Sequence, residues 1–287
     1  ARAEGPAEGG AAPQPVPAGG IATAESRYWY QRNEKNQQLH PVFARYGANW
    51  PCFWGEALIG TGSGDGLKWM CGAERLQAPC VVYSFGSRGN IDFELGIMRM
   101  RRGCEVHVFD PTIGRPKHAP PELQYHMVGL AARTGTERLH GPQSQGKSFK
   151  VMSLADIMRE RGHAHVDVLK VDIETMEFGV FRSLAEVGWP SVGQLLLEVH
   201  LEQDGYGGQA ANTLFNDIEK ADFRLFHLEP NWEFGASCCI EYSFIQRNFT
   251  PQNKAYSMRS PSYTVQPLKT YPQHQHLIDK YLRGKEQ

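Results

Sequence analysis

Acidic and histidine side chains stand where two apolar segments of the chain end. Asp172 and Glu174 follow one of these segments, and Glu198 and His200 close the next. Because alternate residues of a strand share a face, Glu198 and His200 are expected on the same side of theirs. Such groups can take a proton from a substrate hydroxyl, and the unperturbed pKa of histidine suits this task best. We therefore expect Asp172, Glu198 and His200 to be the catalytic residues.

The same three side chains could instead hold a divalent metal ion that orients substrate hydroxyls. Their spacing specifies no metal, and carboxylate clusters are common without one, so a metal is not the favoured interpretation. Asp172-Ile173-Glu174 also resembles the Asp-x-Asp metal motif of glycosyltransferases, which is the second enzyme class that these residues allow.

A short glycine turn, Gly86-Ser87-Arg88-Gly89, follows the apolar segment 80–85, and Asp110 ends the segment 104–109. Glycines let the backbone approach a nucleotide-like ligand, and an acid at the tip of the second strand can bind ribose hydroxyls. The Gly-x-Gly-x-x-Gly pattern of dinucleotide enzymes is absent, which argues against NAD. Each feature alone could be an ordinary turn, but their joint occurrence at strand ends favours a ligand site.

Alternating strands and helices must position these groups. We expect strands at 80–85, 104–109, 124–129, 166–172 and 194–200, and helices at 90–102, 154–161, 175–187 and 209–221. Two further strands, 223–228 and 238–246, follow without a long helix between them. This order predicts a three-layer α/β fold whose mostly parallel sheet ends in an antiparallel hairpin at one edge.

The segments on either side of this pattern are less regular. Residues 1–24 are rich in Ala, Gly and Pro and are expected to be disordered. Residues 25–77 are expected to form a cap with a helix at 25–46 and a flexible surface loop at Gly60–Gly66. Residues 248–287 are expected to form an irregular tail with a helix near 274–283.

The composition excludes few partners. The net charge is −1 with no block of like charge, so nothing indicates nucleic-acid binding. No apolar run reaches the roughly 18 residues of a membrane span. The N-terminal segment would suit a stem, and Asn248-Phe249-Thr250 is a glycosylation sequon. We therefore expect a secreted protein or one in the lumen of the secretory pathway, with the cytoplasm as the alternative.

Six cysteines permit disulfides without showing any. Cys80 and Cys104 each open a strand, six residues before Gly86 and Asp110 respectively, so they would lie at a similar height in neighbouring parallel strands. A disulfide between them is one interpretation, and two buried free thiols are slightly favoured.

Four segments carry a resemblance to a known family. Tyr83–Glu94, Val106–Pro111, Leu169–Glu177 and Leu195–His200 resemble the FkbM-type S-adenosylmethionine-dependent methyltransferases, most closely the animal branch named methyltransferase-like protein 24. The resemblance covers roughly residues 40–247. It implies a class I, Rossmann-like methyltransferase sheet in a domain at 78–247, with S-adenosylmethionine as cofactor.

The resemblance also implies roles for individual residues. Gly86, Ser87 and Gly89 would approach the methionine and ribose of the cofactor, and Asp110 would bind the ribose hydroxyls. Leu130 and Ala131 would lie beside the adenine. The expected reaction is transfer of a methyl group to an oxygen or nitrogen of an unknown acceptor, with Asp172 near the sulfonium.

Ser84 departs from the family pattern. Many such methyltransferases carry an acid at this position, where it helps to hold the methionine amine. A serine can hydrogen-bond but supplies no charge. A non-catalytic protein on the same scaffold is therefore a third interpretation.

Overall fold

The structure is a computed structural model that describes residues 46–62, 64–138, 147–200, 208–231 and 239–249. The segment 1–24, the expected helix at 25–46 except its last residue, and the tail from residue 250 lie outside these ranges. No helix of the described residues is long and apolar enough to span a membrane.

The main sheet has seven strands in the order β11–β12–β10–β9–β3–β4–β5. Strand β12 pairs antiparallel with β10 and with β11, and all other neighbouring pairs are parallel. The strands are β3 (Cys80–Phe85), β4 (Cys104–Phe109), β5 (Gln124–His126), β9 (His165–Val171), β10 (Ser191–His200), β11 (Phe223–Pro230) and β12 (Cys239–Gln246). The predicted class I, Rossmann-like sheet with a terminal antiparallel pair is confirmed.

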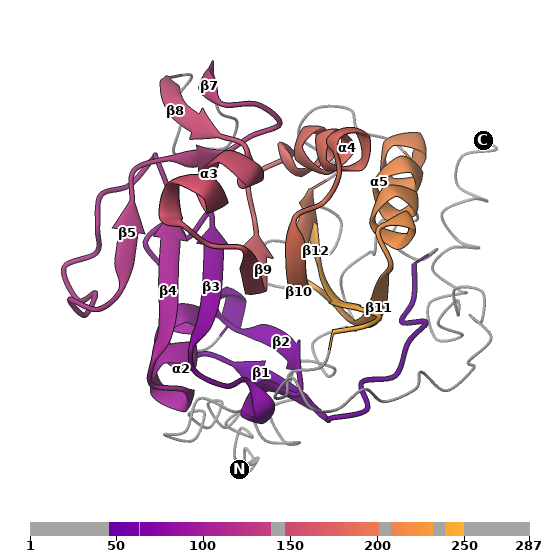
Figure 1. Cartoon of the computed structure of the whole chain (residues 1–287), viewed down its shortest axis with the longest axis horizontal. Helices are drawn as coiled ribbons and strands as arrows, with labels where there is room; N and C mark the ends of the chain where they lie inside the picture. The colour runs from indigo at the N-terminus through magenta and orange to yellow at the C-terminus, as the bar shows by residue number, and fades with distance from the viewer. Residues whose placement is uncertain (1–45, 63, 139–146, 201–207, 232–238, 250–287) are drawn as a thin grey trace, which may run out of the picture.

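Two apolar layers cover the two faces of this sheet. The helices α3 (Leu154–Arg161), α4 (Glu177–Val187) and α5 (Gly208–Lys220) bury one face, and α2 (Asp92–Met100) helps to bury the other. In Figure 1, α3, α4 and α5 lie together at the top of the view and α2 lies at the bottom. Alternation along β3 explains the division, because Tyr83 and Phe85 join the first layer whereas Cys80 and Val82 join the second.

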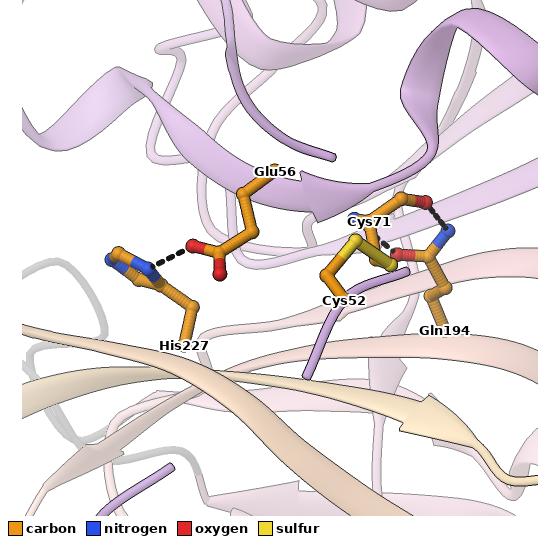
Figure 2. Close-up of a disulfide and its surroundings, with 5 residues drawn as sticks. All are labelled: Cys52, Glu56, Cys71, Gln194 and His227. Atoms are coloured by element: carbon orange, nitrogen blue, oxygen red, sulfur yellow. Dashed lines mark hydrogen bonds and ion pairs between the residues drawn. A yellow bond between two sulfur atoms is a disulfide. The ribbon is translucent and has the colours of Figure 1, made fainter. Parts of the chain in front are cut away.

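A short antiparallel hairpin completes the layer that contains α2. It consists of β1 (Glu56–Ile59) and β2 (Lys68–Cys71), and the sequence did not predict either strand. A disulfide joins Cys52 to Cys71, and the Gln194 side-chain amide of β10 hydrogen-bonds to both the backbone N–H and the carbonyl of Cys71 (Figure 2). Glu56 also pairs with His227 of β11 at 2.8 Å. The hairpin is therefore attached to the sheet by polar contacts as well as by apolar packing.

The expected flexible loop at Gly60–Gly66 is wrong for its described residues, because they pack against the start of α2. Thr61 Oγ1 donates to Asp92 Oδ1 at 2.7 Å, and a Cβ added at Gly66 would meet Asn90 Nδ2 at 2.6 Å. Small residues are needed here because backbone and helix approach closely.

A second, three-stranded sheet contains β6 (Gly129–Leu130), β7 (Gly135–Arg138) and β8 (Ser148–Met152) in the order β6–β8–β7. The predicted strand at 124–129 is therefore split between two sheets, and β7 and β8 were missed because the segment is polar and rich in glycine. Ser153 caps α3, with its hydroxyl accepting a hydrogen bond from the Asp156 N–H at 3.2 Å.

Cys80 and Cys104 form a disulfide, so the favoured expectation of free thiols was wrong. They are directly paired in the register of β3 and β4, with their Cα atoms 4.4 Å apart. Cys239 is also disulfide-bonded, although no chemistry was expected of it.

Candidate active site

The candidate site lies where the strand order of the main sheet reverses, between β3 and β9. Ligands of open α/β sheets bind beyond the carboxyl ends of the strands at such a switch point. The Gly86 turn follows β3, and Asp172 follows β9. Gly86 has φ 75°, and a Cβ at this position would lie 1.6 Å from the Asp172 carbonyl oxygen. Only glycine permits this close approach, which joins the two strand ends.

Asp110 fixes the other side of the turn. Its carboxylate accepts hydrogen bonds from the backbone N–H of Arg88 at 2.8 Å and from the backbone N–H of Thr112 at 2.9 Å. The Ser87 hydroxyl donates to it at 3.5 Å. Gly89 has φ 83°, and a Cβ added there would make only a van der Waals contact, with Ile113 Cγ2 at 3.8 Å. The turn is thus preformed and is not tightly packed at Gly89.

Leu130 and Ala131 are buried at the end of β6, with 2% and 1% of their surfaces exposed. The Ala131 N–H donates to the Met152 carbonyl at 3.0 Å, which holds this segment against β8. Their expected place beside an adenine ring stays a prediction.

A buried acid lies beneath the turn, beside Ser84. Ser84 is fully buried, and its hydroxyl has no hydrogen-bond partner within the described residues. Glu94 of α2 is 1% exposed, lies close to Ser84 and Lys170, and has two carboxyl oxygens that are equally without a partner there. Burial raises the pKa of Glu94, opposed by the charge of Lys170. The sequence analysis found the missing acid at position 84 but not this one.

Lys170 connects the turn to the next strand end. It is buried in β9 opposite Ser84, and its ammonium group donates to the Gly86 carbonyl at 3.0 Å. The same group lies 3.6 Å from Asp172 Oδ2. A charged residue inside an apolar strand was the available sequence signal, because buried charges are retained only with partners.

The three predicted catalytic residues come together around the His200 imidazole. Its Nε2 atom lies 3.8 Å from Asp172 and 3.9 Å from Glu198. Glu174 lies 4.0 Å from the same nitrogen. On the other side of the ring, Glu177 Oε1 is 3.2 Å from Nδ1 and accepts the His200 backbone N–H at 2.8 Å. Glu177 is fully buried and was not predicted from the sequence.

The backbone that leads into α4 is strained where it delivers two of these carboxylates. Glu174 and Thr175 have φ angles of 54° and 77°, which non-glycine residues rarely adopt. Each such residue costs on the order of 1–3 kcal/mol, and such strain clusters at active sites. These two residues also explain why α4 begins at Glu177, two residues later than expected.

The groups around His200 shift the pKa values of the neighbouring Asp172 and Glu198 in opposite directions. Burial alone would lower the pKa of His200, but the carboxylates of Glu177, Glu198 and Asp172 raise it well above its usual value. Burial and the adjacent Asp172 charge raise the pKa of Glu198. Burial opposes ionisation of Asp172, but Lys170 and His200 hold its pKa below the usual value. The charged form is therefore favoured for His200 and for Asp172, and Glu198 is the group that more readily holds a proton.

The hairpin β1–β2 closes this cluster from the side of α2. Lys68 of β2 is 3% exposed and forms an ion pair with Glu241 of β12. Burial disfavours its charge, yet Glu241 and Asp65 raise its pKa. Asn231 donates to Asp65 at 2.9 Å and to Glu198 at 2.8 Å. The hairpin thus contributes a cation to the site, and Asn231, which follows β11, bridges Asp65 of the hairpin turn to Glu198. Neither contribution was predicted.

The negative charges of the carboxylates in this cluster are balanced by positively charged side chains of the protein, namely Lys68, Lys170 and His200. Two groups of side chains here have the proximity of metal ligands, namely Glu198–His200–Cys239 and Asp65–Glu198–Glu241. Cys239 is disulfide-bonded and offers no thiolate, and Lys68 already pairs with Glu241. Asp172 and Glu174, the candidate Asp-x-Asp pair, both face the imidazolium of His200. This arrangement argues against the metal motif of a glycosyltransferase.

Comparison with known proteins agrees with the resemblance. Residues 20–246 match a family described as a methyltransferase domain. A Rattus norvegicus protein named "Probable methyltransferase-like protein 24" is 29% identical over 221 residues, which cover 67% of this chain and 60% of that protein. Its Homo sapiens counterpart is 31% identical over 187 residues, covering 58% and 50%.

A third relative is the 31-O-demethyl-FK506 methyltransferase FkbM of Streptomyces tacrolimicus. It is 36% identical over 64 residues, which cover 22% of this chain and 24% of that protein. The FkbM-type resemblance inferred from four segments is confirmed. The chain spans 60% and 50% of the lengths of the rat and human relatives.

Proposed function

This chain belongs to the family of methyltransferase domains that its residues 20–246 match, and we propose that it moves a methyl group from S-adenosylmethionine to an oxygen or nitrogen of an acceptor. The observation that carries the proposal is the preformed glycine turn at the switch point of the sheet, packed directly against Asp172. This is where a class I sheet holds its ligand, and the proposed acid and base groups surround it.

The residues present fit the cofactor at two points. The turn 86–89 is not tightly packed at Gly89, and Asp110 stands at the tip of β4, the position from which an acid of this fold would bind ribose hydroxyls. Asp110 is 2% exposed and already accepts hydrogen bonds from the turn, so a ribose would have to compete with these bonds. Ser84 and Glu94 offer buried polar atoms that have no partner among the described side chains. When bound, S-adenosylmethionine supplies an electrophilic methyl group on a positively charged sulfur.

We assign to Glu94 the negative charge that many members of this family carry at position 84. Its carboxyl group lies beside Ser84 beneath the turn, although it comes from α2. A cationic amine placed against the turn would favour the ionised form of Glu94 and would satisfy its free oxygens. This assignment supports retained cofactor binding despite Ser84.

Asp172 is the proposed proton acceptor for a hydroxyl acceptor, and His200 is a positioning residue. His200 was expected to be the base, but an imidazolium has no free lone pair with which to accept a proton. Asp172 is ionised, is 19% exposed, and is the member of the cluster beside the glycine turn. Glu198 is 3% exposed and more readily holds a proton, so it can share the proton that Asp172 receives.

We propose a compartment that the disulfides support. Cys52–Cys71 and Cys80–Cys104 would persist in an oxidising environment such as the secretory pathway or the outside of the cell. Asn248 of the sequon is exposed, as a glycosylated asparagine has to be. We place the protein on the secretory route for these reasons.

Binding and transfer measurements test the proposal. Calorimetry and thermal shift with S-adenosylhomocysteine are expected to show binding, and a nucleotide sugar with Mn²⁺ serves as the comparator. Tritium from labelled S-adenosylmethionine should then reach at least one member of a panel of hydroxyl and amine acceptors. Folded protein that fails in both experiments contradicts the proposal, and cofactor binding without transfer to any acceptor supports the non-catalytic interpretation.

A further inference from the structure

A second cluster of titratable side chains lies near the opposite end of β4, outside the candidate active site. Glu105 and His107 point from β4 toward His163, which stands in the turn between α3 and β9. Five residues of strand separate Glu105 from Asp110, which corresponds to about 17 Å at the usual rise per residue. Although His163 stands in a turn, only 13% of its side chain is exposed.

The three side chains present their ligand atoms at the spacing of a metal site. Glu105 Oε2 lies 3.1 Å from His163 Nε2 and 3.5 Å from His107 Nε2, and all three atoms lie within 4.8 Å of one another. Ligand atoms about 2.0–2.1 Å from a tetrahedral Zn²⁺ ion lie roughly 3.3–3.4 Å apart. The distances from Glu105 Oε2 to the two histidine nitrogens, 3.1 and 3.5 Å, therefore lie just below and just above the expected separation of ligand atoms.

His107 supplies an independent sign of a missing partner. Its imidazole is 3% exposed, and its buried Nε2 atom makes no hydrogen bond with any described residue. Buried polar atoms are nearly always satisfied, so an exception calls for an explanation. This nitrogen faces Glu105 and His163, where a metal ion would be its partner.

The other nitrogen of each histidine is already oriented. His107 Nδ1 lies 3.0 Å from His126 Nε2, and His163 Nδ1 lies 2.6 Å from the Tyr83 hydroxyl. Without a metal, His163 Nε2 donates a hydrogen bond to Glu105 Oε2 at 3.1 Å. A metal ion would take the place of this proton. His163 would then carry its proton on Nδ1 and donate to the Tyr83 oxygen, and His107 would carry its proton on Nδ1 and donate to His126, so that both Nε2 lone pairs face the ion. Metal-binding histidines characteristically have such a second hydrogen bond, which fixes the tautomer and the ring orientation.

We propose that Glu105, His107 and His163 bind a divalent transition metal, Zn²⁺ in particular, with water in the fourth position. The Glu105 side chain is 58% exposed, so solvent reaches the open side of the site. The ion would join β4 to the turn before β9, next to the Cys80–Cys104 disulfide that joins β4 to β3. Zn²⁺ has no redox chemistry, which suits a protein with disulfides. The site would stabilise this part of the sheet.

Metal titrations of the purified full chain, stripped with a chelator, test the proposal. Zn²⁺ is added in calorimetry and in thermal unfolding, and Co²⁺ is added to record the visible absorption of tetrahedral coordination. We expect one tight equivalent of metal, the cobalt spectrum, and a higher unfolding temperature with Zn²⁺. Absence of stoichiometric binding by the wild-type chain overturns the proposal.

Four variants make the test specific among the 11 histidines of the chain. Glu105→Gln and His163→Gln should each weaken binding at least tenfold, and the exposed position of Glu105 keeps that variant folded. His165→Gln is the matched control, since this histidine lies two residues away and bonds to Ser191 instead. Less than tenfold weakening in either ligand variant overturns the proposal. Tyr83→Phe should weaken binding by about 10–100-fold through the lost second hydrogen bond.

Discussion

Two clusters of histidine and carboxylate side chains lie at different ends of the same sheet, and their electrostatics are opposite. At the carboxyl end, Glu177, Glu198 and Asp172 surround His200 and raise its pKa well above the usual value despite burial. Near the amino end of β4, burial and the neighbouring His126 lower the pKa of His107 to about 4. The same side-chain type is a cation in one cluster and a neutral imidazole in the other.

The difference lies in how many buried carboxylates face each ring. Glu177 is 0% exposed, so its charge acts on His200 with little screening by water. Glu105, the carboxylate of the other cluster, has a side chain that is 58% exposed and therefore compensates little. A cationic histidine can hold carboxylates in place but cannot bind a metal, whereas a neutral one can.

Replacing Asp172 by Asn should have the largest effect on the cluster at the carboxyl end. It removes the proposed proton acceptor, and general-base contributions are typically 10²–10⁴-fold in rate. We expect a loss of this size in kcat on any hydroxyl acceptor that the wild-type protein methylates, with S-adenosylhomocysteine still bound. Asp156→Asn on α3 is the control, and equal activity of the Asp172 variant would rule out the proposed role.

Replacing Glu177 by Gln should destabilise the fold strongly. Glu177 is fully buried and accepts two hydrogen bonds from His200, one from the backbone and one from the ring. Removing one partner of a buried ion pair typically costs about 3–5 kcal/mol. Urea unfolding should show this loss, whereas Glu186→Gln, exposed on the same helix, should change stability by less than about 0.5 kcal/mol. Similar small changes in both variants would mean that His200 is not held by this pair.

The fold was predictable because its signals are local and repeated. The strands β3 and β4 and the helix α3 begin and end where the apolar pattern and the Ser153 cap placed them. The hairpin β1–β2 was not predicted, because its stability comes from contacts distant in sequence, such as the bond between Gln194 and Cys71. Short strands that depend on tertiary contacts give little periodic signal.

The sequence predicted where the candidate site lies but not which of its side chains carry a charge. The strand tips located Asp172, Glu198 and His200, and the structure brings them together. The sequence could not show that Glu177 faces the same ring from the next helix, and without it His200 looked like a base. The acid beside Ser84 was missed because it stands ten residues further along the chain, on a different element.

The effect of pH gives a finer test of the contrast between the two clusters. The folded-state pKa of His200 is raised above its unfolded value of about 6.5, so folding takes up a proton. The resulting stability is fully present below about pH 6.5 and is lost as the pH rises through the folded-state pKa. The stability difference between the wild-type protein and His200→Gln should therefore shrink between pH 6 and pH 9 in urea unfolding. The exposed His118→Gln variant should show no such trend, and a constant difference for His200 would contradict the raised pKa.

Glu94 presents a third setting, a buried carboxyl group with no histidine and no hydrogen bond within the described residues. Glu94→Gln should leave the unfolding free energy of the ligand-free protein unchanged or higher, because a buried group without a partner costs stability rather than supplying it. The same change should weaken S-adenosylhomocysteine binding by roughly 10- to 150-fold, since a hydrogen bond to a charged partner contributes about 1.5–3 kcal/mol. Thermal unfolding without ligand and calorimetry with ligand separate the two effects. A less stable variant with unchanged affinity would make Glu94 a structural residue, and the charge at position 84 would then be absent from this protein.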